Sequence, residues 1–127
     1  MRLSHALLVA LGGALGAVAR YGVALSVARL APGPFPAGTW TVNMVGAFAV
    51  GLVAPFVLTP QMEGWRLFVV VGVLGGFTTF SAFSLETLGL LRDGRPALAA
   101  LNALGSVFLG LVLTAIGWRL ARVLGAP

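Results

Sequence analysis

The sequence contains no cysteine and no lysine, and only three of its 127 residues are acidic. Without cysteine there is neither a disulfide framework nor a thiolate metal site, and the one histidine, His5, cannot form a histidine cluster. The eight arginines give a formal net charge of +5, but they lie singly at the ends of apolar runs rather than in a patch. We therefore expect no nucleic-acid partner.

Charged residues make up only 9% of the chain, whereas hydrophobic residues make up 59% and the mean hydropathy is +1.04. A soluble domain of this size cannot hide so much apolar surface from water. A lipid bilayer solvates apolar side chains that water does not. The composition therefore predicts an integral membrane protein.

Four apolar segments separate along the chain, at about residues 3–30, 38–58, 65–91 and 96–123. Each reaches the roughly 20 residues with which a helix crosses about 30 Å of hydrocarbon. The connections between them are short and rich in turn-forming residues, which leaves no room for a soluble domain. We predict one all-α domain, residues 1–127, of four transmembrane helices.

The third segment combines glycines with hydroxyl side chains in the middle of the span. Gly72, Gly75 and Gly76 lead directly into residues 77–84, which contain two threonines and two serines and have poor helix propensity. A helix break at membrane depth must line a cavity or lie inside protein, because its freed amides and carbonyls need partners. We predict that the third helix is broken near its middle, at about residues 75–79.

Polar residues inside membrane spans are candidates for function, because each costs free energy unless it has a partner. Asn43 is the clearest example in the second span. In the fourth span a stripe recurs every four residues, with members about 6 Å apart on nearly one helix face: Asn102, Ser106, Gly110 and Thr114. Alternatively, these hydroxyls bond to their own helix and the glycine serves packing.

Phe80 and Phe83 are three residues apart, which places both rings on one face of the helix after the break. The edge of an aromatic ring carries positive quadrupole charge, so such edges can solvate an anion without binding it tightly. Amides and hydroxyls are likewise neutral donors, and together these groups indicate an anion pathway. Two phenylalanines in a membrane span can also be plain core or lipid-facing residues.

Arg20, near the far end of the first span, could raise the anion concentration at the mouth of such a pathway. It could equally extend to the lipid head groups. Glu86, late in the third span, could be an acid at an aqueous vestibule or a partner of Arg20.

Three segments, residues 12–21, 38–46 and 75–84, resemble the fluoride channel family known as Fluc or CrcB. The similarity covers nearly the whole chain, and the third motif is highly specific. The resemblance implies a passive fluoride-selective channel that exports cytoplasmic fluoride and gives fluoride resistance, in the plasma or inner membrane of the cell. It also implies an antiparallel, dual-topology homodimer whose two pores are each lined by both subunits. No residue looks like a nucleophile or base in a water-excluding site, so we expect no enzyme.

The resemblance also implies roles for individual residues. Phe80 and Phe83 would form an aromatic box, and Asn43 would point its amide at a ring or at the ion. The other polar residues of the pathway would be Ser81, Ser84, Asn102, Ser106 and Thr114. A structural Na⁺ would lie on the dimer axis, held by backbone carbonyls of Gly75 and Thr78, and a hard cation that prefers oxygen ligands suits a helix break. Gly110 departs from the family pattern, because some members carry a hydroxyl at this position.

The arginines are balanced between the two sides of the predicted bundle. Four lie on the side of the N-terminus, Arg2, Arg66, Arg119 and Arg122, and four lie towards the other, Arg20, Arg29, Arg92 and Arg95. Since a bias in positive charge normally sets orientation, a balanced count predicts insertion in both directions.

Two other classes of protein were considered. A small four-helix proton-coupled drug transporter needs a membrane-embedded carboxylate in its first helix, and this first span has none. A non-transporting membrane assembly subunit would account for the glycines, but not for the polar stripe and the helix break together.

Overall fold

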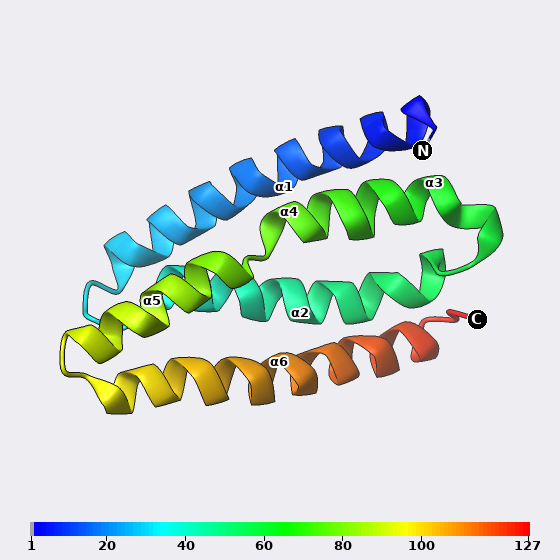
Figure 1. Cartoon of the computed structure of the whole chain (residues 1–127). Coiled ribbons are helices and arrows are strands. Elements are labelled where there is room, and N and C mark those ends of the chain that lie inside the picture. Colours follow the sequence, from blue (N-terminus) through cyan, green and yellow to red (C-terminus); the bar gives the residue numbers. More distant parts are fainter. Residues whose placement is uncertain (1) are drawn as a thin grey trace.

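The computed structural model describes residues 2–127, which fold into helices joined by short connections (Figure 1). The first, second and last long helices are α1 (Leu3–Leu30), α2 (Ala37–Val57) and α6 (Pro96–Val123). Between α2 and α6 the chain forms five shorter pieces: η1 (Pro60–Met62), α3 (Glu63–Trp65), η2 (Arg66–Leu74), α4 (Gly75–Phe77) and α5 (Phe80–Arg92).

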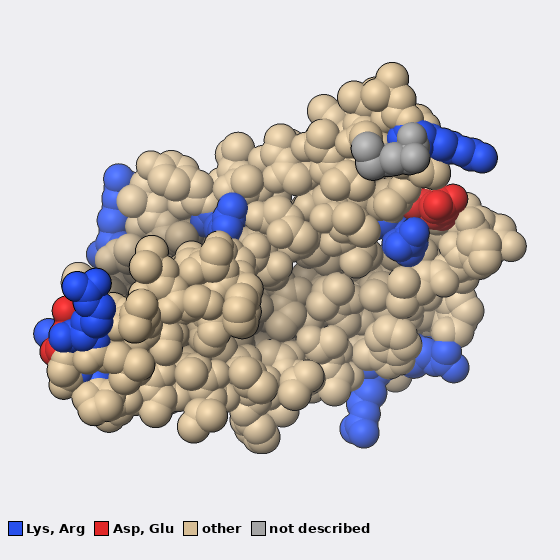
Figure 2. All heavy atoms as spheres, in the orientation of Figure 1, with Lys and Arg blue, Asp and Glu red and all other residues tan. Residues whose placement is uncertain are grey.

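Four helical stretches of the described chain are long and apolar enough to cross a membrane, as predicted: α1, α2, the composite stretch Pro60–Arg92, and α6. They run side by side along the length of the molecule, and the two chain ends lie at the same end of it (Figure 1). Arginines gather at the two ends while the middle of the visible face is uncharged, as expected where head groups meet a bilayer protein (Figure 2).

Two helix pairs hold the bundle together, α1 with η2 and α4, and α2 with α6. Small residues permit both contacts. A Cβ atom at Gly16 would collide with the backbone carbonyl of Val73, and one at Gly51 would collide with that of Thr114. Close backbone approach of this kind drives helix association in lipid, where there is no hydrophobic effect between helices.

The middle of the third span departs from α-helix twice. The segment η2 has the wider π winding, in which the backbone bonds run from residue i to i+5. After the short α4, Thr78 (φ −78°, ψ 159°) and Thr79 (φ −151°, ψ 122°) are extended, and α5 begins at Phe80. Two extended residues at membrane depth leave backbone groups that must find partners elsewhere.

Candidate functional site

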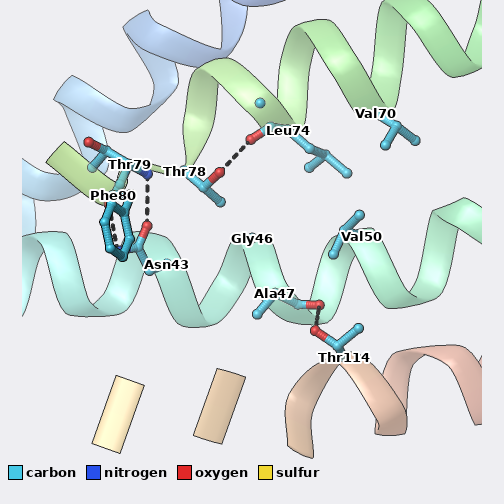
Figure 3. Close-up of a pocket in the computed structure, with 11 residues that line it drawn as sticks. Asn43, Gly46, Ala47, Val50, Val70, Leu74, Thr78, Thr79, Phe80 and Thr114 are labelled. Carbon is cyan, nitrogen blue, oxygen red and sulfur yellow. Dashed lines mark hydrogen bonds between the residues drawn. The ribbon is translucent and has the colours of Figure 1, made fainter. Parts of the chain in front are cut away.

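Asn43, in the second turn of α2, faces the two extended residues and bonds both polar backbone groups of Thr79 (Figure 3). Its Oδ1 accepts from the amide of Thr79 at 2.9 Å, and its Nδ2 donates to the carbonyl of Thr79 at 3.0 Å. One side-chain amide therefore satisfies both backbone polar groups of a residue that has left the helix. The expected contact of this amide with a ring or an ion stays a prediction.

Thr79 in turn caps the N-terminus of α5. Its Oγ1 accepts from the amide of Ala82 at 3.2 Å and lies 3.2 Å from the hydroxyl of Ser81. A hydroxyl in this position satisfies one of the free amides of a helix's first turn. The side chain is buried, so this cap is an internal part of the bundle.

These two side chains divert two amides from their α-helical partners. In a continuous helix the amide of Thr79 would bond the carbonyl of Gly75, and the amide of Ala82 would bond that of Thr78. Both amides instead donate to side-chain oxygens, of Asn43 and of Thr79. The carbonyls of Gly75 and Thr78 are thus left without their α-helical donors.

A cavity of about 420 Å³ is lined by both of these residues, Gly75 and Thr78 (Figure 3). The cavity is lined by α2, by residues of the third span around the extended pair, and by Thr114 of α6. Gly46 makes room here, because a Cβ atom on it would strike the Thr78 side chain. The cavity-lining residues are Asn43, Gly46, Ala47, Val50, Val70, Leu74, Gly75, Thr78, Thr79, Phe80 and Thr114.

A second cavity of about 190 Å³ lies between α2, α5 and α6. It brings Asn43, Phe80, Phe83 and Ser106 together, and all of its lining residues are neutral. The two phenylalanine rings lie 5.4 Å apart between centroids. Within residues 2–127 the buried Ser106 Oγ has no hydrogen-bond partner, which marks it as a donor available to a guest. The remaining lining residues are Met44, Ala47, Val107 and Gly110.

The other expected pathway residues have protein partners. Ser84 donates to the carbonyl of Phe80 at 2.9 Å, and Thr114 donates to the carbonyl of Ala47 at 2.9 Å. Asn102 is only 2% exposed, and its Nδ2 donates to Thr87 Oγ1 at 2.8 Å. The polar stripe of α6 therefore divides: Ser106 reaches the small cavity, Thr114 bonds α2, and Asn102 bonds α5.

Glu86 is bonded to α2 through Thr39, whose hydroxyl donates to Oε1 at 2.7 Å. Both residues line a cavity of about 340 Å³ under the connection between α1 and α2. Across residues 2–127 no ion pair between Glu86 and Arg20 is recorded, and Arg20 is half-buried. The acid therefore borders a cavity at one end of the bundle, with a hydroxyl rather than a guanidinium as its partner.

No role was predicted from the sequence for three threonines of this site: Thr39, Thr79 and Thr87. Thr79 had a readable signal, because a threonine directly before a helix start is a favoured N-cap. The partners of Thr39 and Thr87 come from other helices, 47 and 15 residues away along the chain. No local pattern could indicate those pairs.

The chain is similar in sequence to one protein family and to several named proteins. Residues 7–118 match the family described as CrcB-like protein, Camphor Resistance (CrcB). A protein of Thermus thermophilus named fluoride-specific ion channel FluC is 49% identical over 125 residues, which is 98% of each chain. A protein of the same name from Paracoccus denitrificans is 48% identical over 118 residues, covering 93% of this chain and 94% of its own length.

Proposed function

The chain belongs to the CrcB family, and we propose that it is a passive, fluoride-selective membrane channel. The observation that carries this proposal is the small neutral cavity, where Phe80, Phe83 and Ser106 meet. Neutral donors replace the water around a small anion, whereas a fixed positive charge would favour binding over passage. The aromatic edges and the unpartnered hydroxyl supply such donors.

We further propose that the working form is an antiparallel homodimer with subunits inserted in both directions. Phe80 supports this arrangement, because its side chain is 79% exposed on the single chain although it borders both central cavities. A second copy related by a two-fold axis in the membrane plane would cover the ring with an identical surface. The balanced arginines at the two ends favour insertion both ways (Figure 2).

The proposed dimer would hold a structural Na⁺ at the helix break. The carbonyls of Gly75 and Thr78 suit that role, because the amides that would otherwise bond them donate to Asn43 and Thr79. Hard cations prefer oxygen ligands, and backbone carbonyls are among them. Bound there, the ion would supply a fixed positive charge that holds the two breaks together.

In the cell, the proposed pore exports fluoride across the plasma or inner membrane and so gives fluoride resistance. Hydrogen fluoride crosses membranes as a neutral acid and ionises inside, which traps fluoride in the cytoplasm. An inside-negative potential favours anion exit by about 2.3 kcal/mol per charge per 100 mV. A passive pathway is then sufficient, and no coupled energy source is required.

Efflux from liposomes that contain the purified protein tests the function. Fluoride should leave rapidly while chloride stays, and Ser106→Ala should slow fluoride efflux, because it deletes the unpartnered donor at little cost in packing. Gly22→Ala is a matched control, since a Cβ atom there meets nothing within 4 Å. Equal rates for fluoride and chloride would reject the proposed selectivity.

A further inference from the structure

Asn43 is shared by the two central cavities. It lines the larger one with Gly75 and Thr78, and the smaller one with Phe83 and Ser106. A side chain that borders two cavities and bonds the backbone between them can transmit a change from one to the other. The bonds it makes define what that change would be.

The partner of the Thr79 amide determines whether the carbonyl of Gly75 is free to bind something else. While Asn43 Oδ1 holds that amide at 2.9 Å, the carbonyl of Gly75 is free for another partner. If Asn43 turned away, the same amide could return to the Gly75 carbonyl and close a helical bond. Thr79 Oγ1 does the equivalent for the Thr78 carbonyl by holding the amide of Ala82.

The second bond of Asn43 ties its orientation to the same residue, Thr79. Its Nδ2 donates to the Thr79 carbonyl at 3.0 Å, which uses one of its two N–H groups. The other N–H remains for a guest in the small cavity beside Phe80 and Phe83. One amide can therefore release a carbonyl for a cation and present a donor to an anion in the same orientation.

We propose that Asn43 couples the two sites: it is a positioning residue for the cation at the break as well as a donor in the anion cavity. Thr79 is the second positioning residue, and it acts on the cation side alone through its cap. This proposal rests on the proposed function, but it assigns to Asn43 a role in cation binding that an anion-contacting residue would not have. Loss of the amide should thus weaken Na⁺ binding as well as fluoride passage.

The test measures the thermal unfolding of the purified full-length protein in detergent, in NaCl and in a chloride salt of a large organic cation, alongside fluoride efflux. Na⁺ should raise the unfolding temperature of the wild type. Asn43→Ala and Thr79→Val should each weaken the apparent Na⁺ affinity about tenfold, the equivalent of one hydrogen bond. Thr79→Ser, which keeps the hydroxyl, should restore the Na⁺ response.

Ser106→Ala is the matched control, because Ser106 lines the smaller cavity and not the larger one with Gly75 and Thr78. It should slow fluoride efflux and leave the Na⁺ response at the wild-type level. An unaltered Na⁺ response in Asn43→Ala, or no Na⁺ response in the wild type, overturns the coupling. If the wild type responds to Na⁺ but passes no fluoride, the proposed function fails. The Na⁺ response of Asn43→Ala still decides whether Asn43 has a role in cation binding. Should Asn43→Ala not fold, Thr79→Val against Thr79→Ser decides whether side-chain oxygens control the cation site.

Discussion

At the scale of single residues, Asn102 is buried against α5. The Thr87 hydroxyl accepts a hydrogen bond from the Asn102 side-chain amide and in turn donates one to the carbonyl of Phe83 at 2.7 Å. This chain of bonds ends on the residue that carries one of the two cavity rings. The structure therefore ties Asn102 to α5, and its expected place in the fluoride pathway stays a prediction.

We expect Asn102→Ala to lower the free energy of unfolding by about 1–3 kcal/mol, because it removes packed atoms of a buried side chain and leaves the half-buried Thr87 hydroxyl without a donor. Chemical or thermal denaturation in detergent measures this change. Ser106→Ala on the same helix face should cost far less, since Ser106 Oγ has no partner within residues 2–127. Equal stability of Asn102→Ala and the wild type would return Asn102 to the ion pathway.

The rings of Phe80 and Phe83 give a second prediction at this scale. Phe80→Ile and Phe83→Ile should each slow fluoride efflux several-fold while the protein still assembles, because a branched aliphatic side chain keeps bulk without a positive ring edge. Efflux rates in liposomes and elution by size-exclusion chromatography provide the two measurements. If both variants conduct at the wild-type rate, the rings are only packing residues.

The sequence located most of these residues but not their partners. The amide at Asn43 and the hydroxyls of residues 78–84 were recognisable because polar groups are rare inside apolar spans. That Asn43 bonds the backbone of Thr79, 36 residues away, depends on how α2 lies against the break. Such pairings arise from tertiary packing, and no local spacing encodes them.

At the scale of the elements, the seam between α1 and η2 is a close contact between two helix backbones. Gly12 and Gly16 of α1 face the backbone of η2, where the carbonyls of Phe68 and Val73 occupy the space a Cβ atom would need. The seam continues to the pair Gly13 and Gly76, one step before the extended residues. These glycines bring the two helices close together, but no local pattern in the sequence predicts the π winding of η2.

Gly16→Ala should therefore destabilise the protein by about 1–3 kcal/mol and slow fluoride efflux, because the added methyl group meets a backbone carbonyl that cannot move alone. Gly22→Ala, also in α1, has open space around its Cβ position and should be neutral or slightly stabilising. Comparing the two variants separates the effect of contact with η2 from the general effect of replacing glycine in a helix. A neutral Gly16→Ala would show that the seam is looser than described.

At the scale of the whole molecule, the length and apolar character of the four spans were predictable from composition and run length alone. Assembly depends on charge and symmetry instead. Adding three lysines to the C-terminus should bias all copies to one orientation and abolish fluoride efflux from cells, and co-expression of a copy biased the opposite way should restore it. Full efflux from copies shown by tagging to share one orientation would contradict the antiparallel assembly.

The reversal potential of the current through a planar bilayer tests the central proposal of a passive fluoride-selective channel most directly. With a fluoride gradient opposed by a chloride gradient, and no pH difference, a fluoride-selective pore should reverse at the fluoride equilibrium potential, about 59 mV for each tenfold ratio. Because no proton gradient is present in this experiment, a fluoride current shows that passage needs no proton coupling. Reversal at the chloride potential, or fluoride movement that stops when the proton gradient is removed, would contradict the account.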